Sequence, residues 1–248
     1  MVSPGRVCFT VFGIDIMWYG VLIGIGFVLA TIISYKRAPR LGIKPDSFID
    51  VIIALIPAAI IGARAYYVIF NWSMYAGDLK QIFNIRNGGL AVHGGILLGL
   101  LGVYLVCRKD KENYRDMLDL CAPVLALGQS IGRWGNFFNE EAHGIETDLP
   151  WAQIIDGVGY HPTFLYESIW CFCLFLFLVW FSNHKRSFSG QIILLYFMLY
   201  SFERFFVETL RTDSLMIGPF RQAQVISIAL FIIAFIIYRY LRKESKNT

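Results

Sequence analysis

Long runs of apolar residues recur along the whole chain and are separated by shorter polar segments. A helix that crosses a bilayer needs about 20 mainly apolar residues. The pattern predicts seven such spans, at residues 17–34, 48–70, 90–107, 117–131, 164–181, 191–210 and 222–241. We therefore expect an all-α membrane protein, a bundle of about seven transmembrane helices that forms a single polytopic domain over residues 1–248.

Two of the predicted spans carry polar residues. The fourth is short and includes Asp119, and the sixth begins as an apolar run but then reaches Glu203, Arg204 and Glu208. Between the fourth and fifth spans, residues 132–163 are rich in acids and turn-forming residues. This segment is expected to form a small folded element at the outer face of the membrane.

Basic residues predict the orientation of the chain. Fourteen of the 22 lysines and arginines follow the first, third, fifth and seventh spans or close the chain: Lys36, Arg37, Arg40, Lys44, Arg108, Lys109, Lys111, Arg115, Lys185, Arg186, Arg239, Arg242, Lys243 and Lys246. Because positively charged loops favour the cytoplasmic side, the N-terminus is predicted outside and the C-terminus in the cytoplasm, which requires an odd number of spans. The net charge of +4 therefore indicates a lipid bilayer as the partner, and not nucleic acid.

The composition agrees with a membrane protein. Hydrophobic residues make up 56% of the chain and charged residues only 16%, against roughly 25% charged residues in soluble domains. The five cysteines include no CxxC pair, so neither a disulfide framework nor a zinc site is expected. Glu140, Glu141, His143 and His161 lack the spacing of a metal motif, and we expect no metal. The first apolar run is interpreted as a retained helix because no cleavage site follows it.

Polar residues within the spans gather toward the predicted outer face. A charge at the centre of a bilayer costs about 2.5–3.5 kcal/mol and therefore usually marks a functional site. Arg204 and Glu208 are four residues apart and share one helical face. The other residues predicted near this face are Tyr19, Arg64, His93, Arg133 and Glu167.

Each of these residues also has a structural interpretation. Arg204 and Glu208 could form an ion pair that locks two helices together, and Arg64 could bind neighbouring backbone carbonyls. His93 could be an ordinary interfacial residue, and Tyr19 could belong to an aromatic belt. The residues alone leave these alternatives open.

Two glycine-rich segments strengthen the functional interpretation. They are NGGLAVHGG at residues 87–95 and GRWGNFFNEEAHG at residues 132–144. Glycine lets a backbone approach a ligand closely, and free N–H groups at a helix start favour anions. The alternative is close packing of membrane helices. Because Arg133, Asn136 and Asn139 lie within the second segment, and a guanidinium binds phosphate through paired hydrogen bonds, the pattern favours an anion site.

The second glycine segment resembles the signature of the bacterial prolipoprotein diacylglyceryl transferase family. Further segments agree in the same order: Trp18-Tyr19-Gly20, the glycines around His93, Asp119, the segment from His161 to Glu167, and the segment from Arg204 to Glu208 followed by Arg211 and Asp213. The resemblance covers nearly the whole chain. Glu140 and Phe164 depart from the pattern, which usually has glycine and glutamine there, and this affects the expected conformation of the local loop.

The resemblance implies a seven-helix enzyme of the bacterial cytoplasmic (inner) membrane with its active site toward the outer leaflet. Members of the family transfer the diacylglyceryl group of phosphatidylglycerol to the lipobox cysteine of a prolipoprotein signal peptide. The reaction forms a thioether, releases glycerol phosphate and needs no cofactor. The resemblance implies that Arg133 and Arg204 are essential, and the other implied site residues are Tyr19, His93, Asn136, Glu141, Gly144, Glu167 and Glu208.

The chemistry predicts a role for most of these residues. Arg133 and Arg204 would hold the phosphate, and His93 would be the general base that removes the thiol proton. Glu167 and Glu208 would orient the two arginines. The predicted substrate-binding residues are Tyr19, Arg64, Asn136, Asn139, Glu141, Gly144, Glu167 and Glu208.

Three other classes of protein remain as alternatives. A transporter or flippase for an anionic lipid would share the arginines but would need charges along a path through both halves of the membrane. An intramembrane protease would need paired aspartates, and Asp50 and Asp119 lie at the wrong end of the predicted bundle. A membrane scaffold would leave the arginines without a role.

Overall fold

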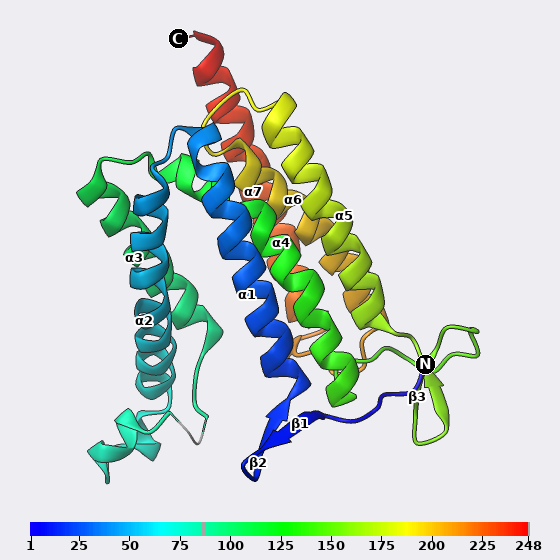
Figure 1. Ribbon diagram of the computed structural model, residues 1–248. Helices are drawn as coiled ribbons and strands as arrows, with labels where there is room; N and C mark the ends of the chain where they lie inside the picture. Colours follow the sequence, from blue (N-terminus) through cyan, green and yellow to red (C-terminus); the bar gives the residue numbers. More distant parts are fainter. Residues whose placement is uncertain (86–87, 248) are drawn as a thin grey trace. The chain divides into compact units, whose positions relative to one another are not determined.

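The computed structural model describes residues 1–85 and 88–247, so Asn87, the first residue of the first glycine segment, lies outside the described residues. The described chain is mainly helical (Figure 1). Its seven α-helices are α1 (Trp18–Arg37), α2 (Pro45–Phe70), α3 (Val92–Asp110), α4 (Tyr114–Asn139), α5 (Thr163–His184), α6 (Gln191–Leu210) and α7 (Gln222–Asn247). Short 3-10 helices are η1 (Ala38–Leu41), η2 (Trp72–Met74) and η3 (Leu79–Phe83).

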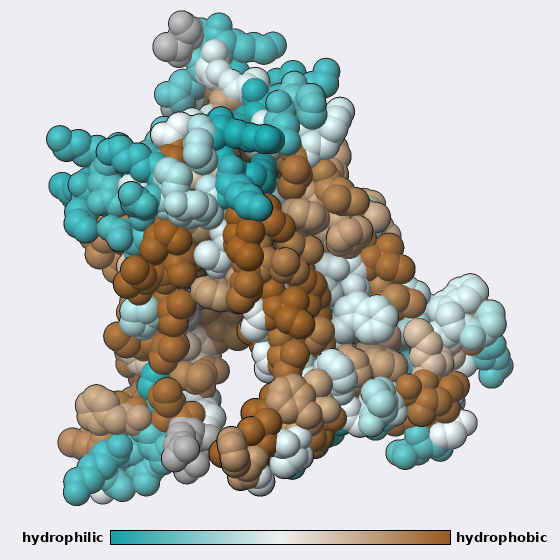
Figure 2. All heavy atoms as spheres, viewed as in Figure 1, coloured by the Kyte–Doolittle hydropathy of each residue, from teal (hydrophilic) through white to brown (hydrophobic). Residues whose placement is uncertain are grey.

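The prediction of a helical membrane protein is confirmed. In the described part of the chain, five helices are long and apolar enough to cross a bilayer, namely α1 together with η1, α2, α3, α5 and α7. Hydrophobic residues cover the middle of the helices, whereas hydrophilic residues gather near the end of α7 (Figure 2). The remaining two, α4 and α6, carry the polar residues noted in the sequence.

The chain divides into two compact units, which are described separately. The first comprises Met1–Ser34 and Leu118–Thr248, and the second comprises Tyr35–Met117. Helix α4 begins near the predicted fourth span but continues to Asn139, so residues 132–139 are helical and not part of a connection. Aromatic packing explains the extension, because Phe138 stacks on Trp18 with ring centroids 4.7 Å apart and Phe137 packs against Phe164 at 4.9 Å.

Small and polar residues join the helices of the first unit. A Cβ atom on Gly26 of α1 would lie 3.7 Å from Cα of Gly128 on α4, so these helices approach closely. On α4, Ser130 Oγ donates a 2.8 Å hydrogen bond to the carbonyl of Ser168 on α5. The apolar core of this unit is built by α4, α5, α6 and α7, and its fully buried members include Leu178 and Ile192.

Asp119 of α4 caps the start of α6. The backbone N–H groups of Gly190, Ile192 and Ile193 each donate to its carboxylate at 2.9 Å. Arg186 Nε donates to the same carboxylate at 2.9 Å. The first N–H groups of a helix have no partner within the helix, so a fully buried carboxylate supplied by another helix satisfies them.

Three short antiparallel hairpins complete the first unit. They are formed by β1 (Val7–Val11) with β2 (Ile14–Met17), β3 (Gln153–Ile155) with β4 (Val158–Tyr160), and β5 (Met216–Ile217) with β6 (Phe220–Arg221). The N-terminal segment runs beside β3, where the N–H of Ile154 donates to the carbonyl of Met1 at 2.7 Å. The β3–β4 hairpin lies within the predicted folded element at residues 132–163.

In the second unit, α2 and α3 pack through glycine. A Cβ atom on Gly62 would overlap the carbonyl oxygen of Gly94, and one on Gly94 would overlap the carbonyl oxygen of Gly62. Gly95 is also tight, since its Cβ would lie 3.2 Å from the carbonyl oxygen of Ala59. For Gly94 and Gly95, the close-packing interpretation of the first glycine segment is therefore confirmed.

Candidate active site

Glu167 joins the two arginines that the sequence singled out. Its Oε2 atom lies 2.8 Å from Arg133 Nε, and its Oε1 atom accepts a 2.5 Å hydrogen bond from Arg204 Nη1. The three residues come from α4, α5 and α6, so this carboxylate ties three helices together. Residues far apart in the sequence thus form one charged cluster in a mostly apolar unit.

Two further side chains position the arginines. Glu208 Oε2 lies 2.6 Å from Arg204 Nη2, one helical turn along α6. Tyr200 Oη, one turn before Arg204, accepts a 3.4 Å hydrogen bond from Arg133 Nη2. Arg204 and Glu208 therefore form the ion pair that the structural alternative predicted, but both lie on α6, so this pair does not lock two helices together. The helices are joined through Glu167.

The burial of the cluster is asymmetric. The carboxylates are almost completely buried, with side-chain exposures of 1% for Glu167 and 2% for Glu208, whereas Arg133 and Arg204 are 21% and 17% exposed. A guanidinium has five N–H donors, and the contacts above occupy two on each arginine. The acids therefore hold the arginines from the inside, while the remaining donors can bind an anion from outside.

Tyr19 lies against α4. A Cβ atom on Gly135 would overlap Cδ2 of the Tyr19 ring, so only glycine allows the ring to pack there. Gly135 is two residues after Arg133 and directly before Asn136. Four predicted residues, Tyr19, Arg133, Arg204 and Glu167, thus belong to one unit and to adjoining helices.

The segment after α4 carries three more predicted residues. Asn139 Nδ2 donates to Glu141 Oε1 at 3.2 Å, and both side chains lie near the surface. The N–H of Gly144 donates to the carbonyl of His161 at 2.9 Å. A Cβ atom on Gly144 would lie 2.7 Å from Cβ of His161 and 3.1 Å from the carbonyl oxygen of Leu210. Glycine is needed here because the chain passes between the start of α5 and the end of α6.

Arg64 and His93 belong to the second unit. Arg64 is buried and donates to four backbone carbonyls: Gln81 at 2.6 Å, Ile82 at 2.7 Å, Gly88 at 3.0 Å and Gly89 at 2.8 Å. It also lies 5.1 Å from the centroid of the Tyr75 ring. These contacts match the interpretation of Arg64 as a residue that binds carbonyls. His93 is the second residue of α3, and its exposed ring lies 6.1 Å from that of Tyr66.

Sequence reasoning missed Tyr200 and left Arg211 and Asp213 without a role. The spacing of four residues between Tyr200 and Arg204 was the available signal for Tyr200. Just beyond α6, Arg211 Nε and Nη2 bind the two oxygens of Asp213 at 2.9 and 2.7 Å. The Arg211 guanidinium lowers the pKa of the Asp213 carboxyl below its usual value through these paired hydrogen bonds.

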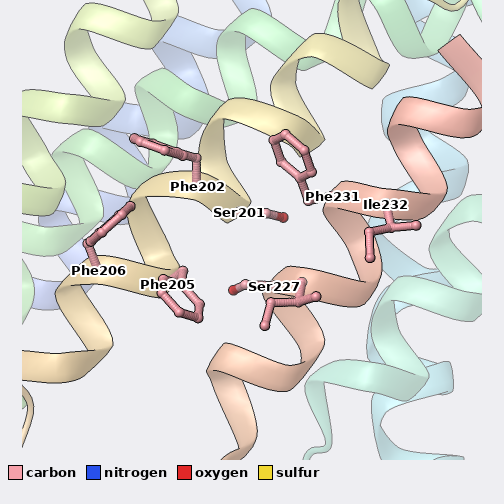
Figure 3. Close-up of a pocket in the computed structure, with 8 residues that line it drawn as sticks. Ser201, Phe202, Phe205, Phe206, Ser227, Phe231 and Ile232 are labelled. Carbon is pink, nitrogen blue, oxygen red and sulfur yellow. The ribbon is translucent and has the colours of Figure 1, made fainter. Parts of the chain in front are cut away.

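A separate groove lies between α6 and α7 and has a volume of about 270 Å³ (Figure 3). It is lined by Ser201, Phe202, Phe205, Phe206, Ser227, Ile228, Phe231 and Ile232. None of these lining residues is charged and none is a predicted site residue. The groove therefore lacks the groups that would bind a phosphate, in contrast to the arginine cluster.

Comparisons with known proteins show the family of the chain. Residues 6–240 match the family model described as prolipoprotein diacylglyceryl transferase. The chain is 52% identical over 242 residues to the phosphatidylglycerol–prolipoprotein diacylglyceryl transferase of Clostridioides difficile (strain 630), covering 98% of this chain and 97% of that protein. Proteins of the same name from Finegoldia magna and Clostridium novyi are 49% and 44% identical, covering 96% and 98% of both chains respectively. The chain therefore belongs to the prolipoprotein diacylglyceryl transferase family.

Proposed function

We propose that this protein transfers the diacylglyceryl group of phosphatidylglycerol to the lipobox cysteine of a prolipoprotein, forming a thioether and releasing glycerol phosphate. The names of its relatives support the lipid and the protein substrate. The observation that carries the proposal is the bridge from Glu167 to both Arg133 and Arg204. It holds two guanidinium groups together and leaves some of their N–H donors available for a ligand. A phosphodiester is the anionic part of phosphatidylglycerol, and paired guanidinium donors suit it.

In the proposed reaction, the cysteine sulfur forms a bond to the terminal glyceryl carbon while the bond from that carbon to the phosphate oxygen breaks. The electron pair of the broken bond stays on the oxygen, so the leaving glycerol phosphate gains one negative charge. Arg133 and Arg204 bind this phosphate and stabilise the developing charge. Preorganised donors of this kind typically contribute about 3–4 kcal/mol each to the transition state.

The thiol proton must also be removed. A free cysteine thiol has a pKa near 8.5, so a base increases the thiolate fraction at neutral pH. We propose that His93 takes this proton and later returns it to the phosphate product or to solvent, a role worth about 10²–10⁴-fold in rate. His93→Gln tests the assignment, and full transfer activity of this variant at neutral pH would refute it.

The remaining site residues are proposed to bind or shape the lipid headgroup. Tyr19 and Asn136 would contact the glycerol hydroxyls, and Glu167 and Glu208 would keep the arginines oriented. The exposed pair of Asn139 and Glu141 would contact substrate at the edge of the site. Gly144 would hold the adjacent loop, with Arg64 supporting a second loop through its carbonyl contacts.

For the topology, we propose seven spans in one polytopic domain, with the N-terminus outside, the C-terminus cytoplasmic and the site toward the outer leaflet of the bacterial cytoplasmic membrane. Pairing within the protein supports counting α4 and α6 as spans, because their polar groups bind one another: Arg133 and Arg204 bind Glu167, and Asp119 binds the start of α6. The excess of basic residues on alternate connections supports the orientation.

A reconstituted transfer assay tests the function. Purified protein is incubated with phosphatidylglycerol vesicles and a lipobox peptide, and mass spectrometry measures the added diacylglyceryl group. Product is expected with phosphatidylglycerol and absent with phosphatidylcholine. Lipid movement without covalent product would favour a flippase and refute the transfer.

Lysine variants test the arginine pair in the same assay. Arg133→Lys and Arg204→Lys keep the charge but lose the planar fork, and each is expected to reduce the transfer rate by about 100-fold. Arg108→Lys is the matched control, because Arg108 is exposed at the end of α3. Near-normal transfer by either site variant would show that paired guanidinium binding is not needed.

A further inference from the structure

The β1–β2 hairpin has one apolar face. In its register, Phe9 faces Ile16 and Val11 faces Ile14, and residues that pair directly across two strands lie on the same side of the ribbon. The opposite side is polar, because Thr10 pairs with Asp15 and donates a 2.6 Å hydrogen bond to its carboxylate. The hairpin is therefore amphipathic although it is only two strands wide.

The described chain leaves most of this apolar face uncovered. Phe9 is 50% exposed, Ile14 is 66% exposed, and Phe12 at the tip is completely exposed. Exposing large apolar side chains to water is unfavourable. A group of them on one side of a small element indicates a surface that contacts something apolar.

The turn of the hairpin adds an independent observation. Phe12 and Gly13 connect the strands, with φ values of 51° and 78°. Two-residue turns of this kind favour asparagine, aspartate or glycine, because positive φ is strained for a bulky side chain. Turn chemistry therefore does not account for phenylalanine at the tip, and an external contact of its side chain does.

The position of the hairpin identifies what it contacts. β2 ends at Met17 and α1, one of the helices apolar enough to cross a bilayer, starts at Trp18. Trp18 and Tyr19 are aromatic residues of the kind that gather at membrane–water interfaces. The hairpin is thus joined directly to the first residue of a helix that is apolar enough to cross a bilayer.

We propose that the apolar face and tip of the β1–β2 hairpin insert into the headgroup layer of the bilayer, with Thr10 and Asp15 facing water. The occupant of this surface is the lipid interface itself. Trp18 stacks on Phe138 and Tyr19 packs on Gly135, so the inserted hairpin is connected to the end of α4 that carries Arg133. Insertion sets the depth of the arginine cluster relative to the lipid phosphates, and this consequence rests on the proposed function.

Fluorescence quenching tests the insertion without reference to catalysis. Phe12→Trp and the control Thr10→Trp are each reconstituted in bilayers with and without lipid brominated on the acyl chains near the headgroup, and the emission of the unsubstituted protein is subtracted. Bromolipid is expected to quench the emission added at position 12 roughly threefold more strongly than that added at position 10. Equal quenching at the two positions overturns the proposal. The proposal is also overturned if the emission at position 12 is protected from solvent only when lipobox peptide is present, since the side chain would then contact the peptide and not the lipid.

The variant Phe12→Asn tests the link to the site. Asparagine suits the turn better than phenylalanine, so a purely structural role predicts unchanged or higher activity and stability. Our proposal predicts a transfer rate in bilayers reduced about tenfold, because one inserted aromatic ring is lost. A transfer rate equal to that of the parent would overturn the inference that insertion of the hairpin sets the depth of the arginine cluster. If the parent itself makes no thioether product, the transfer function fails, while the quenching contrast still decides the insertion.

Discussion

Replacing Asp119 by asparagine is expected to destabilise the protein severely while leaving its shape nearly unchanged. The buried carboxylate accepts four hydrogen bonds, two on each oxygen. Asparagine has one oxygen and an NH₂ group, so it can accept two of the four. The other two donors then face an NH₂ group, which cannot accept.

The magnitude follows from those two donors. Leaving a buried donor unsatisfied costs about 1–3 kcal/mol, and more for a charged group such as Arg186. Removing one partner of a buried ion pair costs about 3–5 kcal/mol in other proteins. We therefore expect a loss of roughly 3–5 kcal/mol in the free energy of unfolding, with the start of α6 opening first.

The measurement is reversible unfolding in detergent, combined with hydrogen exchange of the amides of residues 190–193. Asp46→Asn is the control, because Asp46 is exposed in the first turn of α2 and its charge contributes only a few tenths of a kcal/mol. A change below about 1 kcal/mol for Asp119→Asn, or unaltered exchange at residues 190–193, would contradict the capping role.

Three further predictions follow from the packing and the charges. Gly94→Ala drives a methyl group into the backbone of α2 and should cost about 1–3 kcal/mol, measured as thermal stability. Gly135→Ala displaces the Tyr19 ring and should lower the transfer rate with little loss of stability. The reduction is expected to reach about 100-fold, because a displacement of about 1 Å can have that effect on an active site. An unchanged rate would show that Tyr19 is not part of the site. Because Arg211 lowers the pKa of Asp213 in the folded state, the pair stabilises the protein above the unfolded carboxyl's pKa of 3.8, and this contribution is lost as the pH falls through the lower folded pKa. Asp213→Asn should therefore reduce stability at neutral pH and match the parent at strongly acidic pH.

Much of the site was predictable because the types of its residues indicate its chemistry. Arginines and glutamates inside apolar runs are costly unless they pair or function, so Arg204, Glu167 and Glu208 are distinguished by the sequence alone. Arg133 is distinguished by its place in the second glycine segment. Tyr200 is not, because a tyrosine in an apolar helix is common and its role depends on which arginine the neighbouring helix brings to it.

Arg64 and the first glycine segment show the opposite case. Both fit an anion site by composition, and for both the alternative was structural. The structure places the donors of Arg64 on carbonyls of the following segment and places Gly94 against Gly62, contacts that depend on how the chain turns between α2 and α3. The local sequence does not predict the path of the chain through that turn.

The sequence by itself determined that the chain is a helical membrane protein, the approximate positions of its helices and which charged residues are candidates for chemistry. Only the tertiary structure decided that one carboxylate would hold two arginines, that Asp119 would cap a helix more than 70 residues away, and that α4 would continue through Gly135 to Asn139. The physical reason is that hydrophobicity and the cost of a buried charge act on each residue where it stands. Hydrogen bonds and close packing, in contrast, depend on partners that folding brings together.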